Sequence, residues 1–209
     1  MSQRRASHHN RCPECRINKH FCVCEHLAQL KTSTNVSLIV HVSELKLTSN
    51  TAQFVEKLLP EQSQIFIRGR VHENFSPTEL LQRPGRALFL FPDENSQELN
   101  QKFLDKYPGP YHLIVPDGNW TQAKKVKKRE ELFDNIPTVR LPAGPVGEYR
   151  LRKAPRPEWV STFEAVAHAL GVLDGSAVRD SMLNFFRKWV EATLAARSGD
   201  FSHVQGKQD

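Results

Sequence analysis

The sequence predicts a single α/β domain behind a small cysteine-rich module, and three observations support that fold class. From residue 36 onward, short apolar runs alternate with segments of helical periodicity, the pattern of a sheet covered by helices. All four cysteines lie between Cys12 and Cys24, ahead of this alternation. The 209 residues are 39% hydrophobic and 25% charged, which suffices for one buried core. We therefore expect an N-terminal arm and cysteine module at residues 1–30, the α/β domain at 31–197 and a polar tail at 198–209.

The apolar runs and the helical periodicity give the expected elements. Five runs predict strands at residues 36–41, 64–68, 87–91, 112–116 and 138–141. Helical spacing predicts helices at residues 50–59, 96–106, 161–173 and 178–196. The sequence contains neither the glycine-rich dinucleotide-binding motif after a strand nor a P-loop. The common nucleotide-binding folds are therefore not supported.

The charge balance favours a polyanionic partner. The chain has 29 lysines and arginines against 23 aspartates and glutamates, a net charge of +6, and such an excess attracts nucleic acid. The longest apolar runs fall far short of the roughly 20 residues of a membrane-spanning helix, and no apolar stretch follows the basic start of the chain. We therefore expect a cytoplasmic protein that is neither secreted nor embedded in a membrane.

The cysteines predict a structural zinc site. Two close pairs separated by a short loop can bring four thiolates to one tetrahedral centre: Cys12, Cys15, Cys22 and Cys24. The neighbouring Arg11, Arg16 and Lys19 would offset the negative charge of these thiolates. The alternative is a set of four reduced thiols that hold no metal.

The apolar run at residues 112–116 delivers an acid and an aromatic residue to its carboxyl end, the edge of an α/β sheet at which ligands bind. Desolvation would raise the pKa of Asp117, which suits a general base, and Trp120 can stack on a nucleobase or a cofactor. The alternative makes Asp117 the cap of the following helix and places Trp120 in the core.

Several motifs in one order resemble those of the DTW-domain proteins, bacterial tRNA-uridine aminocarboxypropyltransferases. The signature of that family is similar to Asp117-Gly-Asn-Trp120 followed by Gln122-Ala123. Further matches are His41-Val-Ser-Glu44, Lys46, Asn50-Thr51, Leu141-Pro142, Tyr149-x-x-Arg152-Lys153 and Ser161-Thr-Phe-Glu-Ala165. Together with the four cysteines, the likeness spans residues 11 to 190.

Two positions depart from the family pattern. Asn119 stands where the family usually has threonine, and Val42 stands where it usually has proline. Asparagine keeps a hydrogen-bonding side chain but lacks the hydroxyl of threonine. No role of that hydroxyl is therefore carried over to this chain.

The resemblance implies a SPOUT-like sheet domain with a C-terminal trefoil knot that holds S-adenosylmethionine, a threading that is rare among proteins. It implies transfer of the 3-amino-3-carboxypropyl (acp) group of S-adenosylmethionine to N3 of a tRNA uridine in the variable loop, which forms acp3U and releases methylthioadenosine. Asp117 would be the catalytic base, and Trp120 would line the wall around the transferred chain. The implied cofactor-binding residues are Asn50, Thr51, Gly118, Leu141, Pro142, Tyr149, Ser161, Thr162 and Glu164, with Leu141, Pro142 and Tyr149 near the adenosine.

Some of these residues also have a structural explanation. Ser161 and Glu164 form a capping-box pattern at the start of the expected helix at residues 161–173. Asn50 and Thr51 can simply begin a helix. Both explanations stay open beside the cofactor-binding one.

Basic residues concentrate next to the expected site. Residues 124–156 contain ten basic and four acidic side chains, an excess equal to that of the whole chain. Phosphate contacts of a tRNA would use this surface, and a solvated helix face is the alternative. The expected RNA-binding residues are Lys124, Lys125, Lys128, Arg150, Arg152 and Lys153.

Two other functions fit the same sequence. A SPOUT-like RNA methyltransferase would use the same cofactor, and a non-catalytic zinc-dependent RNA-binding protein would need only the basic surface and the cysteines. The chain is expected to be a monomer or a homodimer.

Overall fold

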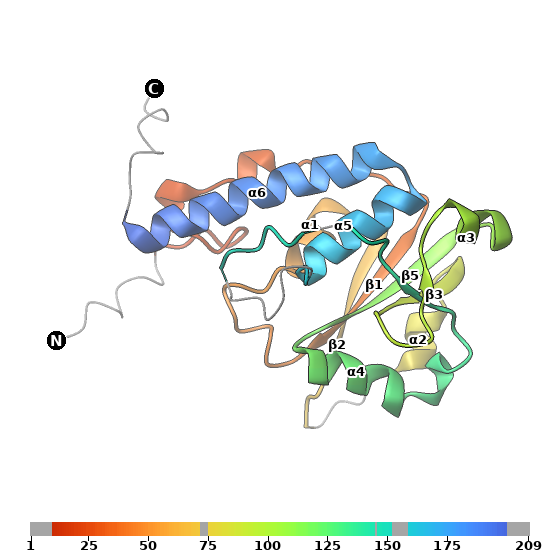
Figure 1. Ribbon diagram of the computed structural model, residues 1–209. Helices are drawn as coiled ribbons and strands as arrows, with labels where there is room; N and C mark the ends of the chain where they lie inside the picture. Colours follow the sequence, from red (N-terminus) through yellow and green to blue (C-terminus); the bar gives the residue numbers. More distant parts are fainter. Residues whose placement is uncertain (1–9, 72–74, 145, 152–158, 200–209) are drawn as a thin grey trace.

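A parallel β-sheet lies between two layers of helices in the computed structural model, which describes residues 10–71, 75–144, 146–151 and 159–199 (Figure 1). Its six strands follow the order β2-β1-β5-β3-β6-β4, and every pairing is parallel. The strands are β1 (Asn35–His41), β2 (Ser63–Arg68), β3 (Arg86–Leu90), β4 (Gln97–Glu98), β5 (Tyr111–Asp117) and β6 (Thr138–Arg140). The α/β class and the five expected strands are confirmed.

Helices cover both faces of the sheet. One face packs against α1 (Gln53–Leu58), α5 (Thr162–Leu173) and α6 (Ser176–Ser198), and α3 (Gln101–Lys106) contributes Phe103 to the same apolar cluster. The other face packs against α2 (Pro77–Leu81) and α4 (Trp120–Arg129). The central strand β5 is buried along its whole length, as expected of a parallel strand covered on both sides.

The helix expected at residues 96–106 is shorter than predicted. It begins only at Gln101, because the side chain of Asn100 caps it by accepting a hydrogen bond from the amide of Phe103. The preceding Gln97 and Glu98 instead pair with β6. Apolar periodicity alone did not reveal this two-residue strand.

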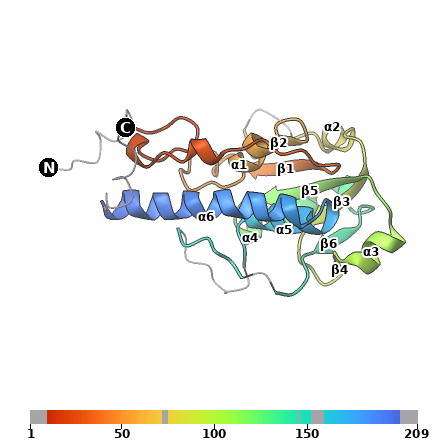
Figure 2. The same ribbon diagram turned by 90° about the horizontal axis from the view of Figure 1, so that it is seen from above.

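The N-terminal module packs along the last helix (Figure 2). It contains two short 3-10 helices, η2 (Lys19–Phe21) and η3 (Cys24–His26). Outside the module, a further 3-10 helix, η4 (Glu131–Phe133), follows α4. The fully buried indole of Trp189 in α6 donates to the carbonyl of Cys15 at 3.0 Å. The module therefore shares one apolar core with the sheet, and the boundary at residue 30 stays a prediction.

The trefoil knot also stays a prediction, because strand order does not define how the chain is threaded. Within the part of the chain that the structure describes, no helix combines the length and the apolar character needed to cross a membrane.

Candidate ligand-binding site at the carboxyl edge of the sheet

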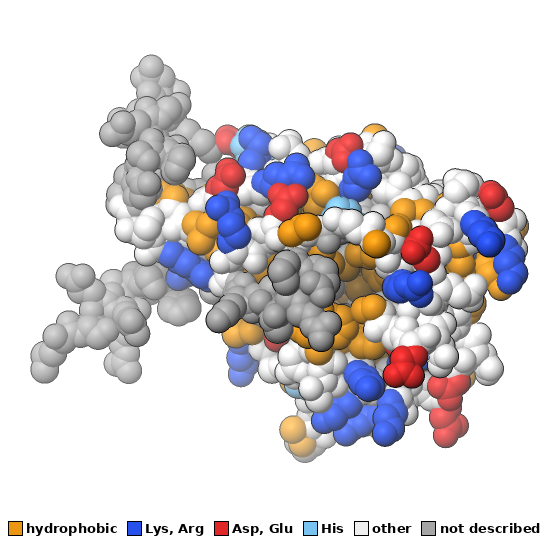
Figure 3. Space-filling model, in the orientation of Figure 1, with side chains coloured by type: hydrophobic (Ala, Val, Ile, Leu, Met, Phe, Trp, Pro, Cys, Tyr) orange, Lys and Arg blue, Asp and Glu red, His pale blue; other side chains and the backbone are white. Residues whose placement is uncertain are grey.

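A large apolar cavity lies at the carboxyl ends of the strands. Its volume is about 460 Å³, and its walls include Phe91, Val115, Trp120, Leu141, Pro142 and Ala165. These residues follow or end β3, β5 and β6, or belong to α4 and α5. Figure 3 shows apolar side chains gathered in a hollow above α4. The position is the one at which ligands bind in parallel α/β sheets.

A second, polar cavity adjoins the first. It has a volume of about 280 Å³, and its lining includes Glu44, Asn50, Thr51, Asp117, Tyr149 and Ser161. The two cavities share Gly118, Trp120, Trp159, Val160 and Thr162. One elongated ligand with an apolar end and a polar end can therefore occupy both.

Asp117 is held in place by side chains from two distant segments. The residue is only 8% exposed. One carboxylate oxygen accepts from the Asn50 amide at 2.9 Å, and the other accepts from the Thr162 hydroxyl at 2.5 Å. These two bonds hold the carboxylate in the wall of the polar cavity.

Neither structural alternative for Asp117 and Trp120 fits. The N-cap of α4 is Asn119, whose side chain accepts from the amide of Gln122 at 2.9 Å while the Gln122 side chain accepts from the Asn119 amide at 2.8 Å. Trp120 is 39% exposed and lies outside the core, with its ring 4.4 Å from that of Trp159 and 5.5 Å from that of Phe91.

The capping role of Asn119 explains its departure from the family pattern. Threonine and asparagine both serve as N-caps. Gly118 precedes it with φ +150°, and a Cβ there would lie 2.8 Å from the Gln122 side-chain oxygen. Glycine thus permits the tight passage from β5 into α4.

Glu164 has the capping geometry that its sequence pattern allowed. It is 1% exposed, and its two oxygens accept from the amides of Ser161 at 2.6 Å and Glu148 at 2.5 Å. Burial raises its pKa, and the hydrogen bonds from Ser161 oppose that rise. Its carboxylate fastens the segment around Glu148 to the start of α5. A direct contact of Glu164 with a ligand stays a prediction.

The other expected cofactor-binding residues divide between the two cavities. Leu141 and Pro142 line the apolar cavity, whereas Asn50, Thr51 and Ser161 line the polar one. Tyr149 lines the polar cavity, and its hydroxyl donates to the carbonyl of Ser49 at 2.5 Å. Its expected place near the adenosine stays a prediction. Sequence reasoning missed Phe91 and Trp159, since nothing local distinguishes either from an aromatic core residue.

The basic residues of α4 have different environments. Lys124, Lys125 and Lys128 are exposed, and Figure 3 shows Lys and Arg side chains gathered over α4. Lys125 lines a third cavity of about 240 Å³ with Arg68, Arg129 and Asp117. Lys127, by contrast, is bound to Asp93 at 3.2 Å and to the Thr138 hydroxyl. A lysine of the basic stretch can therefore be structural.

The remaining expected RNA-binding residues lie beyond α4. Arg150 is exposed. Arg152 and Lys153 lie outside the described residues.

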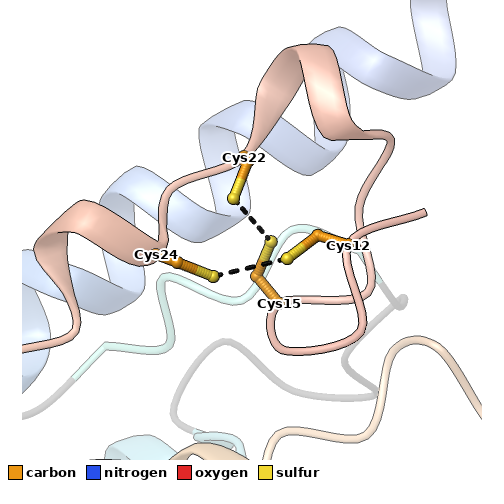
Figure 4. A group of neighbouring side chains, drawn as sticks. All are labelled: Cys12, Cys15, Cys22 and Cys24. Atoms are coloured by element: carbon orange, nitrogen blue, oxygen red, sulfur yellow. Dashed lines mark hydrogen bonds between the residues drawn. The ribbon is translucent and has the colours of Figure 1, made fainter. Parts of the chain in front are cut away.

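The four cysteine sulfurs converge on one point (Figure 4). All lie within 4.8 Å of one another, with 3.5 Å between Cys12 and Cys24 and 3.8 Å between Cys15 and Cys22. Burial raises the pKa of the Cys15 and Cys24 thiols. The donor set fits a tetrahedral zinc ion.

The parallel sheet, the paired cavities at its carboxyl edge and the four-sulfur cluster define an α/β protein with a candidate ligand-binding site and a candidate metal module. The chain belongs to the DTW domain family, whose model matches residues 9–194.

Curated relatives come from animals and plants. The chain is 26% identical over 170 residues to tRNA-uridine aminocarboxypropyltransferase 2 of Drosophila melanogaster, and the alignment covers 79% of this chain and 67% of that protein. It is 27% identical over 177 residues to the Mus musculus protein of the same name, covering 82% and 59%. It is 25% identical over 222 residues to tRNA-uridine aminocarboxypropyltransferase A of Arabidopsis thaliana, covering 91% and 84%. The chain thus spans about three fifths of the mouse protein.

Among solved structures, the SAM-dependent rRNA:acp-transferase Tsr3 from Vulcanisaeta distributa aligns with a TM-score of 0.45 and 17% identity. The alignment covers 82% of this chain and 84% of that chain.

Proposed function

We propose that the protein transfers the acp group of S-adenosylmethionine to N3 of a tRNA uridine, forming acp3U in the variable loop and releasing methylthioadenosine. Membership of the DTW family and the names of the relatives support this proposal. The observation that carries it is the position of Asp117, a buried acid in the wall of a polar cavity that adjoins a large apolar one.

The two cavities match the two ends of S-adenosylmethionine. The adenosine occupies the apolar cavity beside Leu141 and Pro142, and the amino acid end occupies the polar cavity beside Asn50, Thr51 and Ser161. The sulfonium then lies at the shared wall, next to Trp120. Because a sulfonium activates all three attached carbons, this orientation selects the acp chain over the methyl group.

The chemical step is a substitution at carbon. Asp117 accepts the N3 proton of the uracil, and the N3 electron pair forms a bond to the γ-carbon of the methionine chain. The bond between that carbon and sulfur breaks, and its electron pair leaves on neutral methylthioadenosine. Asn50 and Thr162 hold the acid during this step.

The RNA lies over the exposed basic side chains of α4 and Arg150, with Arg152 and Lys153 as further predicted contacts. Phosphate contacts of this kind position an RNA without reading its sequence. The enzyme acts in the cytoplasm, as a monomer or a homodimer.

The four thiolates hold a structural zinc ion that fixes the N-terminal module against α6. Metal analysis of the purified protein should find one zinc per chain, and Cys12→Ser should lose it. Full zinc content in that variant would remove Cys12 from the site.

Nucleoside analysis of tRNA incubated with the protein and S-adenosylmethionine tests the function. Mass spectrometry should detect acp3U in the RNA and methylthioadenosine in solution. A methylated nucleoside with S-adenosylhomocysteine would instead show a methyltransferase. A protein that binds tRNA but gives no heat with S-adenosylmethionine in calorimetry would be a non-catalytic RNA-binding protein.

A further inference from the structure

Three arginines meet in a small cavity between the cysteine module and α6. The cavity has a volume of about 180 Å³, and its lining includes Arg11 and Arg16 of the module and Arg197 at the end of α6. Thr48 and Thr193 add hydroxyl groups to the walls. No carboxylate occurs among the described residues that line it. Three like charges at one cavity repel one another, and an anion between them would offset this repulsion.

Each guanidinium is held by a backbone carbonyl. A terminal nitrogen of Arg11 donates to the carbonyl of Arg16 at 2.9 Å, and one of Arg197 donates to the carbonyl of Leu151 at 3.2 Å. Arg16 donates to the carbonyl of Leu45 at 3.3 Å. None of the three arginines forms an ion pair with another described residue. Because a guanidinium has five N–H donors, each retains donors for a ligand.

Two further observations indicate that the cavity takes a hydrogen-bond acceptor. The Nε atom of Arg11 is buried and has no hydrogen-bond partner in the protein, which is rare for a buried donor. Arg16 has φ 60° and is the only non-glycine residue with positive φ in the described ranges. Arginine is not among the residues that favour this conformation. An anion in the cavity would accept a hydrogen bond from the Arg11 Nε atom. It would also give the Arg16 side chain a partner of opposite charge.

The cavity lies next to the candidate active site. Thr48 lines the arginine cavity, whereas the following Ser49 and Asn50 line the polar cavity that contains Asp117. Arg16 is bonded to this same segment through Leu45 and Leu47. A ligand of the arginine cavity would therefore sit behind the segment whose Asn50 holds the catalytic acid.

We propose that this cavity binds a backbone phosphate of the substrate RNA and so positions the RNA on the side of the site remote from α4. The identity of the ligand as RNA rests on the proposed function. Arginine suits the role, because its planar fork of donors matches two phosphate oxygens at once. The contact would set the register of the RNA without reading its sequence.

Charge-removing variants of two arginines test the proposal. Arg197→Gln removes an exposed cation from the end of α6. Arg16→Gly removes the guanidinium and at the same time relieves the positive φ, so the module should keep its fold and its zinc. Arg179→Gln is the matched control, since it removes the same charge from the same helix at a residue that is paired with Asp180.

The measurement is tRNA affinity over a series of salt concentrations. For Arg197→Gln and Arg16→Gly, affinity should fall, and the slope of log K against log salt should decrease by about one, the loss expected for one phosphate contact. The affinity and slope of Arg179→Gln should match those of the wild type. Calorimetry with S-adenosylmethionine should be unchanged in Arg197→Gln and Arg179→Gln.

Inorganic phosphate serves as a probe for the source of the anion. It should compete weakly with tRNA for the wild-type protein and less for Arg197→Gln. Unchanged tRNA affinity and slope in both zinc-loaded variants would overturn the proposal. So would phosphate binding that is lost in the variants while tRNA binding stays intact, because the cavity would then serve a free anion. The comparison of these variants with the wild type measures RNA binding and not acp transfer. A failure to form acp3U would therefore count against the proposed function alone.

Discussion

The two ends of β5 each bury a titratable side chain, and they differ in what surrounds it. At the amino end, His112 is fully buried, and its Nε2 lies 2.8 Å from the Ser37 hydroxyl on the neighbouring strand. At the carboxyl end, Asp117 is also buried, but two cavities open on it. Burial alone therefore does not mark a functional group. A buried polar group beside space for a ligand does.

The largest effect is expected when the acid of this pair is neutralised. Asp117→Asn keeps the size of the side chain but removes the base, so the rate of acp transfer should fall by about 10²–10⁴-fold. tRNA affinity should stay close to that of the wild type. Single-turnover assays and binding assays on the same preparation measure both quantities. Transfer at the wild-type rate would exclude Asp117 as the base.

His112 should affect the free energy of unfolding and leave the rate of acp transfer unchanged. Burial, and to a lesser degree the nearby charge of Arg83, lowers the pKa of His112 to about 4. The unfolded chain, with a histidine pKa near 6.5, takes up the proton first. The stability that neutral His112 provides is therefore present above about pH 6.5 and is lost as the pH falls toward 4, by about 3 kcal/mol.

Denaturant unfolding between pH 7 and pH 4 checks this expectation. His112→Gln should reduce the acid-induced loss of stability, because glutamine does not titrate in this range, while acp transfer at pH 7 stays intact. Equal pH dependence in the variant and the wild type would contradict the role assigned to His112.

The capping boxes of α4 and α5 should differ in how much they contribute to stability, because the box of α5 is buried more deeply. In Glu164→Gln, one side-chain oxygen becomes an NH2 group that faces a backbone N–H, so the free energy of unfolding should fall by about 1–3 kcal/mol. Gln122→Glu makes the reverse exchange at the half-exposed box of α4 and should change stability by about 0.5 kcal/mol or less. Urea unfolding of both variants gives the comparison, and equal losses would contradict it.

The weakest effects concern the surface of α4. Lys124→Gln and Lys128→Gln together should reduce the salt slope of tRNA binding by about two, one for each lost phosphate contact. Lys127→Gln is the control, because its amine is already bound to Asp93 and Thr138. Its slope should match that of the wild type. An unchanged slope in the double variant would show that α4 does not contact phosphate.

The sequence was sufficient wherever the signal was local. Five apolar runs predicted five strands, and the cysteine spacing predicted a cluster that the structure brings together. The two-residue β4 and the five-residue α2 are too short to carry a periodic pattern. The place of Tyr149 in the polar cavity had no local signal, because it depends on the Ser49 carbonyl, 100 residues away. The lysine stretch likewise did not reveal that Lys127 belongs to Asp93.

The hydrogen bonds of Asp117 make the site a product of the complete fold. Its partners Asn50 and Thr162 lie 67 and 45 residues away along the chain, one before it and one after it. Each of these contacts closes a long loop, so it costs chain entropy that only the packing of the whole fold offsets. A chain without α5 would therefore lose the Thr162 hydroxyl, one of the two donors that hold the carboxylate in place.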